Sequence, residues 1–170
     1  MLNRSITMQL RQANSDDTQI VVQILNTSRQ TYLPYAESPH SLAETSSWVG
    51  NILIPTGGVI ISQLNEEDVG VLATSISDEV ERDKPGFDRP GGRVGWIDQL
   101  YIAPGHVGKG VGTELLEHAL SILPRPIRLW TFQENQRAIS FYKRHGFTPI
   151  EYTNGENNEE KCPDVLFELK

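Results

Sequence analysis

A run of glycines between an apolar strand and an apolar helix is the feature that most constrains how this chain can fold. The segment from Ile102 to Thr113 reads IAPGHVGKGVGT and has Gly108, Gly110 and Gly112 at alternate positions. Glycine adopts positive φ and lets other groups approach the backbone, so several N–H groups of such a loop can point towards one spot. The segment therefore predicts a concave loop that binds an anion.

The residues after the glycines predict a helix from about Gly110 to Leu123. Apolar residues recur there at helical spacing, namely Val111, Leu115, Leu116, Ala119 and Leu120. The unpaired N–H groups and the positive dipole end of this helix would add to the anion site. Lys109 supports the same conclusion, because a cation beside a helix N-terminus is unfavourable unless a ligand brings negative charge.

Two better-known phosphate loops fit this segment poorly. A Walker A loop requires a lysine followed by Ser or Thr, whereas Lys109 is followed by Gly110. A dinucleotide-binding loop requires a third glycine in a different place and an acidic ribose partner about 20 residues further on. A nucleotide-binding P-loop domain is therefore not expected. A tight turn without any ligand is the alternative for the loop taken alone.

A second motif, NQRAISFYKRHGF at residues 135–147, follows an expected strand. Asn135 is suited to cap a helix, and helical spacing places Asn135, Ala138 and Tyr142 along one stripe. A polar cap, a small residue and a phenol on one face can line a narrow groove. A capped amphipathic helix that packs Phe141 into a core is the alternative. The position of the motif after a phosphate loop favours the groove.

Because the glycine loop and the motif at residues 135–147 follow each other in this order, the chain resembles the GNAT superfamily of acetyl-CoA-dependent N-acetyltransferases. Residues 100–104 resemble the family's fourth strand, residues 107–112 its pyrophosphate loop, and residues 135–147 its Asn-x-x-Ala-x-x-Phe-Tyr-x-x-x-Gly-Phe segment. The first position of the loop is normally Gln or Arg and is Val107 here. Because the family holds the pyrophosphate mainly through backbone amides, we expect weakened rather than abolished cofactor binding.

The resemblance implies one α/β (α+β) domain over residues 1–170. The implied sheet is mixed and mostly antiparallel, has six to seven strands, is splayed between strands 4 and 5, and is flanked by about four helices. Acetyl-CoA is the implied acyl donor, and its pantetheine arm would pair with the backbone of the fourth strand. The implied cofactor-binding residues are Leu100, Tyr101, Ile102, Val107, Gly108, Lys109, Gly110, Val111, Gly112, Thr113, Asn135 and Tyr142.

Acetyl transfer to an amine needs a neutral nucleophile, which suggests a base because amines are mostly protonated at pH 7. Asp98 is the candidate, and period-2 alternation predicts it on the strand face of Trp96 and Leu100. We expect it to act through water or to position the ammonium group. A structural aspartate that is hydrogen-bonded within the sheet is the alternative.

Tyr142 is the candidate donor of a hydrogen bond to the coenzyme A sulfur. Its phenol is protonated at neutral pH, and full proton transfer to a thiolate would be uphill, so hydrogen-bond stabilisation is the expected role. The expected reaction is direct attack in a ternary complex, without a covalent enzyme intermediate. A non-catalytic acyl-CoA-binding sensor or partner-binding module is the rival function. A polyamine, an amino acid, an aminoglycoside and a protein N-terminus all stay open as acceptors.

Charge and composition exclude several other classes. The chain has a net charge of −7 and a pI near 5.1, which argue against nucleic acid and anionic membranes as partners and suit a cationic amine. The four histidines show no ligand spacing, so no metal is expected. No apolar run approaches the length of a membrane span, and Met1–Arg4 lacks the apolar core of a signal peptide, so we expect a soluble cytoplasmic protein. A homodimer would be consistent with the resemblance.

Other elements follow from local patterns. Strands are expected at residues 8–12, 58–62, 69–76, 94–102 and 127–132, and helices at about residues 18–29 and 41–51. The charged loops 77–93 and 154–164 are either solvated or involved in acceptor binding. The single cysteine, Cys162, is expected in a polar loop without a partner, so it is not expected to be a nucleophile.

Overall fold

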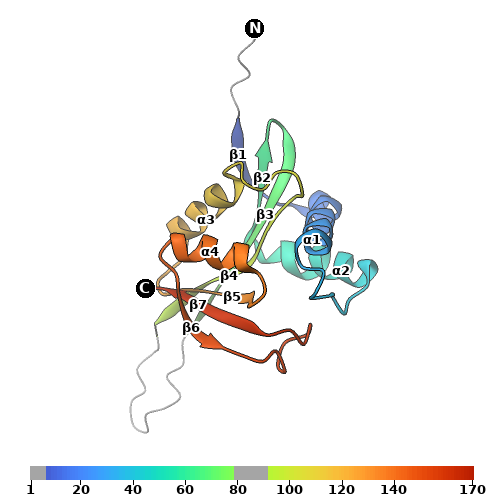
Figure 1. The fold of residues 1–170 in the computed structure, drawn as a ribbon. Helices are drawn as coiled ribbons and strands as arrows, with labels where there is room; N and C mark the ends of the chain where they lie inside the picture. Colours follow the sequence, from blue (N-terminus) through green and yellow to red (C-terminus); the bar gives the residue numbers. More distant parts are fainter. Residues whose placement is uncertain (1–6, 79–91) are drawn as a thin grey trace.

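A mixed sheet of seven strands, in the order β1-β2-β3-β4-β5-β7-β6, forms the centre of the molecule (Figure 1). The structure, a computed structural model, describes residues 7–78 and 92–170. The strands are β1 Met8–Gln12, β2 Val59–Leu64, β3 Glu67–Asp78, β4 Arg93–Ile102, β5 Ile127–Phe132, β6 Thr148–Tyr152 and β7 Asp164–Leu169. The α-helices of the described residues are α1 Thr18–Tyr32, α2 Leu42–Trp48, α3 Val111–Ile122 and α4 Gln136–Arg144. The predicted fold class is therefore confirmed.

Capping residues begin the helices of the first half. Asn14 caps a short 3₁₀ turn, Ser15–Asp17, which leads directly into α1. Ser41 and Glu44 form a capping box at α2. The expected second helix does not continue as a regular α-helix, because a π-helical turn, Val49–Leu53, and a 3₁₀ turn, Ile54–Thr56, follow α2.

The helices cover the two faces of the sheet separately. On one face, α1 and the irregular turns after α2 bury an apolar cluster that includes Val21, Ile61 and Val71. On the other face, α3 and α4 bury a larger cluster that includes Leu72 and Leu115. Val71 and Leu72 are neighbours in β3, so alternation along a single strand supplies both layers.

The sheet divides between β4 and β5, which form its parallel pair. Their register includes just two residue pairs, Gly95 with Ile127 and Trp96 with Arg128. Beyond these pairs, β4 continues beside β3 and β5 continues beside β7. The carboxyl ends of β4 and β5 therefore diverge, which confirms the expected splay.

The structure describes the expected charged loop at 154–164 but only the ends of the one at 77–93. Most of the charged segment 77–93 lies outside the described residues, since residues 79–91 are not described. The segment between β6 and β7 is a loop, as expected, and it returns towards α1 and α2 (Figure 1).

Candidate active site

The glycine loop between β4 and α3 has the backbone conformation that an anion cradle requires. Gly105, Gly108 and Gly110 have φ values of 87°, 80° and 86°. A Cβ atom at any of the three would meet no atom within 4 Å, so backbone conformation and not packing requires glycine here. Gly112 lies within α3, inside the expected helix, and an added Cβ there would be 3.6 Å from the ring of Phe141.

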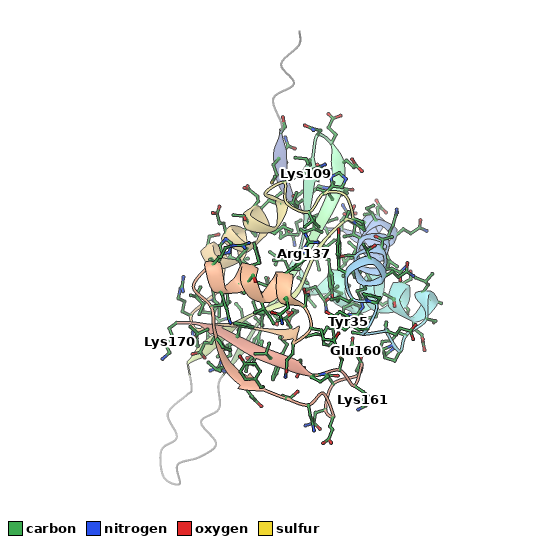
Figure 2. The ribbon with its side chains drawn as sticks, viewed as in Figure 1. Tyr35, Lys109, Arg137, Glu160, Lys161 and Lys170 are labelled. Carbon is green, nitrogen blue, oxygen red and sulfur yellow. The ribbon has the colours of Figure 1, made fainter. Side chains whose placement is uncertain are left out.

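The N-terminus of α3 adds free N–H groups to this loop. The first hydrogen bond of the helix runs from Glu114 N to Gly110 O at 3.0 Å, so the N–H groups of residues 111–113 have no acceptor within the helix. Val111 itself is buried in the core, which means that its backbone, and not its side chain, faces the loop. Lys109 is exposed at the tip of the loop (Figure 2). The arrangement can accommodate a diphosphate.

A small groove of about 140 Å³ extends from this loop along β4. Five residues expected at the cofactor line it together, namely Leu100, Tyr101, Ile102, Val107 and Asn135. Asn135 Oδ1 accepts a hydrogen bond from Ala138 N at 3.2 Å, which caps α4 as expected. The groove thus lies beside the divergence of β4 and β5.

Arg137 is a groove residue that the sequence analysis missed. Arg137 is labelled in Figure 2. Its guanidinium carbon lies 5.1 Å from the centre of the Tyr32 ring, and both residues line the groove. A cation in the first turn of a helix is unfavourable unless an anion lies nearby. Lys109, just before α3, indicates an anion for the same reason. That argument, applied to α4, could have identified Arg137.

Tyr142 lies in the apolar core beneath the groove. Its side chain is 7% exposed, and its ring packs edge-on against Phe141 and Phe147. Burial raises the pKa of its phenol, and the nearby Tyr101 raises it further. The phenol therefore stays protonated, but Tyr142 is not among the residues that line the groove.

Asp98 lies at an irregularity of β4 that the expected alternation did not include. Ile97 and Gln99 pair with consecutive residues of β3, Thr74 and Ala73, which leaves Asp98 as the extra residue of a β-bulge. A bulge shifts the alternation by one residue. The prediction that Asp98 shares a face with both Trp96 and Leu100 is therefore wrong, because those two residues lie on opposite faces of the sheet.

The bulge presents the Asp98 carboxyl group at the surface while protein atoms still surround part of it. Desolvation raises the pKa of this carboxyl group, and a side-chain hydrogen bond with Ser75 opposes the rise. A carboxylate with a raised pKa is better suited to accept a proton than a free one. Asp98 lies next to Gln99, which lines a second and larger pocket.

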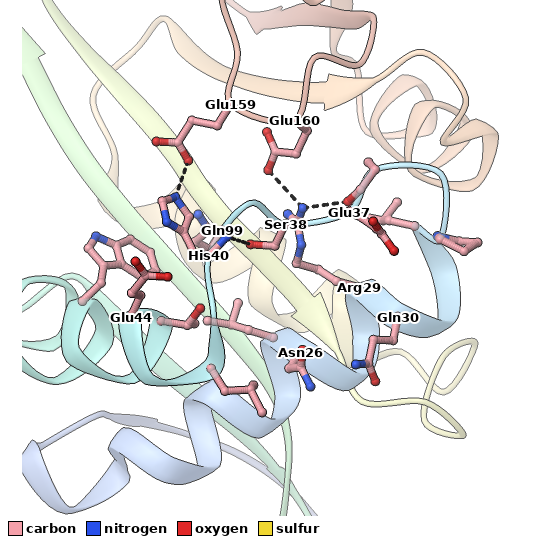
Figure 3. A pocket seen from close by; sticks show the side chains of 17 residues that line it. Asn26, Arg29, Gln30, Glu37, Ser38, His40, Glu44, Gln99, Glu159 and Glu160 are labelled. Atoms are coloured by element: carbon pink, nitrogen blue, oxygen red, sulfur yellow. Dashed lines mark hydrogen bonds and ion pairs between the residues drawn. The ribbon is translucent and has the colours of Figure 1, made fainter.

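This second pocket has a volume of about 890 Å³ and lies on the α1 and α2 side of β4 (Figure 3). Its walls come from α1, the connection to α2, α2 itself, Gln99 and the β6–β7 loop. Four carboxylates line it, those of Glu37, Glu44, Glu159 and Glu160, and one guanidinium, that of Arg29. The pocket therefore has an acidic lining.

Two ion pairs join the walls of this pocket. Arg29 Nη2 lies 3.0 Å from Glu160 Oε1, and it also donates to the carbonyl oxygen of Ala36 at 3.0 Å. His40 Nε2 lies 2.8 Å from Glu159 Oε2, and this contact raises the pKa of His40 (Figure 3). Both pairs connect the α1–α2 region to the β6–β7 loop. Sequence reasoning assigned no role to Arg29 or His40, because their partners are more than a hundred residues away.

Asn158 holds the β6–β7 loop in place. Its side chain donates to Cys162 O at 2.7 Å and to Asp164 Oδ2 at 2.9 Å, and it accepts from Cys162 N at 3.2 Å. Cys162 is buried, in contrast to the expected polar surroundings, and burial raises the pKa of its thiol. The thiol therefore stays protonated, which agrees with the expectation that it is not a nucleophile.

The groove and the acidic pocket meet at β4. Leu33 lines both cavities, and the neighbouring residues Gln99 and Leu100 line the acidic pocket and the groove respectively. A group bound in the groove and a group bound in the acidic pocket would therefore approach each other across this strand.

Comparison with known proteins identifies the class. Residues 22–147 match the model of the acetyltransferase (GNAT) family, and the chain belongs to this family. Over 105 residues it is 30% identical to the uncharacterized N-acetyltransferase MJ1207 of Methanocaldococcus jannaschii, covering 58% of this chain and 42% of that relative. Over 68 residues it is 43% identical to the peptidyl-lysine N-acetyltransferase YjaB of Escherichia coli, covering 39% of this chain and 44% of YjaB. The chain thus matches less than half the length of these two relatives.

Solved structures show the same fold. The apo form of YjaB from Escherichia coli superposes with a TM-score of 0.68 at 20% identity, covering 95% of this chain and 97% of that one. Arabidopsis thaliana NAA60 in complex with acetyl-CoA superposes with a TM-score of 0.68 at 19% identity, covering 96% and 98%. At 20% and 19% identity, these two superpositions establish a shared fold and nothing more.

In the parts of the chain that the structure describes, each helix is too short or too polar to cross a membrane.

Proposed function

We propose that this chain is an N-acetyltransferase that transfers the acetyl group of acetyl-CoA to a primary amine of a cationic acceptor. The observation that carries the proposal is the pair of cavities that meet at β4, one beside an anion-binding loop and the other lined by carboxylates. Family membership supports acetyl-CoA as the acyl donor. The acidic lining of the second pocket supports a positively charged acceptor.

The cofactor side would use mainly backbone groups. The amides of the glycine loop and of the first turn of α3 would hold the diphosphate, and Lys109 and Arg137 would supply positive charge. From Ile97 onward, β4 pairs with β3 on one edge, so its other edge is open to the pantetheine arm at Leu100–Ile102. Bound acetyl-CoA supplies the activated acyl group, and the residues named here bind and orient it.

The acceptor side would select for positive charge and then remove a proton. The carboxylates of the acidic pocket raise the local concentration of an ammonium group. Asp98, beside the pocket, would accept a proton through water, because a neutral amine is needed for attack. Tyr142 would stabilise the departing sulfur by a hydrogen bond. The reaction would be direct, since the buried and protonated Cys162 is unsuited to form an acyl-enzyme.

The experiment that tests this proposal measures thiol release from acetyl-CoA in the presence of different amines. The panel contains polyamines, amino acids, an aminoglycoside, a lysine-containing peptide and a peptide with a free N-terminus, with a reaction without amine as the control. The Cys162→Ser variant removes the protein's own thiol from the signal. We expect amine-dependent turnover, greatest for acceptors with more than one positive charge.

Two results would count against the enzyme. Binding of acetyl-CoA without turnover on any amine would favour the rival function, an acyl-CoA sensor. Absence of both binding and turnover would refute the cofactor assignment as well.

A further inference from the structure

A small apolar cluster separates the groove from the acidic pocket. Leu33, Ala36 and Cys162 are its buried members, and Tyr35, Tyr101 and Phe132 pack against them. We call these six residues the partition. Ala36 lines the acidic pocket, Tyr101 lines the groove, and Leu33 lines both. The other three residues, Tyr35, Phe132 and Cys162, line neither cavity and pack behind those that do.

Tyr35 is the unusual member of the partition. Its hydroxyl oxygen is buried and has no hydrogen-bond partner among the residues that the structure describes. Its ring lies edge-on to Phe132, with centroids 6.3 Å apart and planes at 86°. In Figure 2 it lies where the α1–α2 region meets the loop that carries Glu160. A buried polar group without a partner destabilises a fold, so this hydroxyl needs an explanation.

The surroundings of the hydroxyl define what it can bind. Its ring packs in one cluster with Tyr101, near the end of β4, and Phe132, at the end of β5, which places it beside the divergence of the two strands. Burial raises the pKa of this phenol to about 12, so it keeps its proton across the physiological range. The missing partner is therefore a hydrogen-bond acceptor that enters the divergence of the two strands.

We infer that the Tyr35 hydroxyl donates a hydrogen bond to the carbonyl oxygen of the acetyl thioester, which makes Tyr35 a further catalytic residue. This inference rests on the proposed function. The thioester carbonyl is an acceptor that would come close to the partition, because Leu33 and Tyr101 line the groove and pack in one cluster with Tyr35. A phenylalanine at position 35 would make the same ring contacts and lack this donor.

The hydrogen bond would be stronger during the reaction than before it. As the C–N bond forms, negative charge develops on the carbonyl oxygen, and this charge passes to sulfur as the C–S bond breaks. The ammonium group gives one proton to Asp98 through water before the attack. The nitrogen loses a second proton after the C–N bond forms, and the departing thiolate or the solvent accepts it. The phenol stabilises the charge and keeps its own proton throughout.

The test compares two ligands that differ in the acetyl group. Calorimetry would measure the Kd of acetyl-CoA and of coenzyme A for the wild type, for Tyr35→Phe, and for Tyr152→Phe as an exposed control. For Tyr35→Phe we expect acetyl-CoA to bind about tenfold more weakly and coenzyme A to bind within about twofold of the wild type. The kcat of this variant should fall about ten- to a hundredfold. Tyr152→Phe should change none of these values.

Stability without ligand separates this role from a structural one. Removing an unpaired buried hydroxyl should leave the Tm of the ligand-free protein unchanged or raise it. Equal weakening of both ligands, unchanged affinity for acetyl-CoA, or a clearly lower Tm of the ligand-free variant would each overturn the inference. Amine-dependent turnover of the wild type tests the proposed function separately, because the ratio of the two Kd values does not depend on turnover. A wild type that binds neither ligand would overturn both.

Discussion

The groove and the acidic pocket meet at β4 and differ in what holds their walls together. The glycine loop beside the groove depends on local backbone conformation, with positive φ at Gly108 and Gly110, while the groove itself joins residues 100–137 to Tyr32 and Leu33. The acidic pocket depends on ion pairs between segments that are far apart in the chain, such as Arg29 with Glu160. The conformation of the glycine loop is thus encoded locally, whereas the walls of the acidic pocket are joined by long-range contacts.

The largest expected effect tests this difference with one type of substitution. Gly155 has φ 82°, and a Cβ there would lie 2.4 Å from the carbonyl carbon of Cys162. Gly155→Ala should therefore cost about 3 kcal/mol in the free energy of unfolding, from backbone strain and overpacking. Gly108→Ala has the same type of φ and open space around it, so it should cost only about 1 kcal/mol. Urea denaturation measures both, and equal costs would contradict the account.

The second effect concerns Asp98, the proposed base, which lies next to Gln99 of the acidic pocket. Asp98→Asn should lower kcat about a hundredfold, because amine deprotonation loses its acceptor. The carboxylate is the active form and its pKa is raised, so the wild-type rate should fall as pH decreases through a value above 3.8. The acidic limb of the pH–rate profile should disappear in the variant. A variant with unchanged kcat and an unchanged profile would assign Asp98 a structural role.

The third effect measures how strongly the acidic pocket depends on its partly buried ion pair, Arg29 with Glu160. Arg29→Met leaves Glu160 and the Ala36 carbonyl oxygen without their partner, and we expect a loss of about 2 kcal/mol in stability. A double-mutant cycle with Glu160→Gln should give a coupling energy of about 1 kcal/mol or more. Coenzyme A affinity should stay unchanged. Strictly additive effects would show that the pair does not hold the pocket walls together.

The fourth effect concerns the groove side. Tyr142→Phe should lower kcat about tenfold if the phenol stabilises the departing sulfur, and should change stability by less than about 1 kcal/mol, since the ring contacts are kept. Full turnover of the variant would restrict Tyr142 to packing, which its place in the core also allows. Stopped-flow or steady-state thiol release gives the comparison.

The smallest effect concerns the exposed ion pair of the acidic pocket. Glu159 raises the pKa of His40 above its ordinary value of 6.5, so the pair is present at low pH and is lost as pH rises through the raised value. His40→Gln should change the KM of the amine about twofold, as expected for an exposed pair. An NMR titration of His40 checks the direction. A His40 pKa below 6.5 would contradict the observed contact.

The contrast between local conformation and long-range contacts explains which parts of the structure the sequence could predict. The glycine loop, the Asn135 cap and the strands and helices around them follow from local patterns, and the structure has them at or within a few residues of the expected positions. Local propensity and capping act over a few residues, so a single sequence reveals them. The splay of β4 and β5 came from the family resemblance and not from a local pattern.

The parts that the sequence could not predict depend on other segments. The bulge at Asp98 arises from the register with β3, and it reversed the expected face of the neighbouring residues. The burial of Cys162 depends on Asn158 and on the α1–α2 connection. The ion pairs of Arg29 and His40 and the ring contact of Tyr35 with Phe132 join residues that only folding brings near. Pairings between distant segments leave no periodic signal in the chain.

Amide hydrogen exchange tests the central claim, that cofactor and acceptor occupy separate cavities, most directly. Exchange is measured for the wild type alone, with acetyl-CoA, and with coenzyme A plus the amine that gives the highest turnover. The account predicts that acetyl-CoA slows exchange in residues 100–113 and 135–138, and that residues 37–45 and 156–161 respond only when the amine is added. Protection of the acidic pocket by acetyl-CoA without protection of the glycine loop would contradict it.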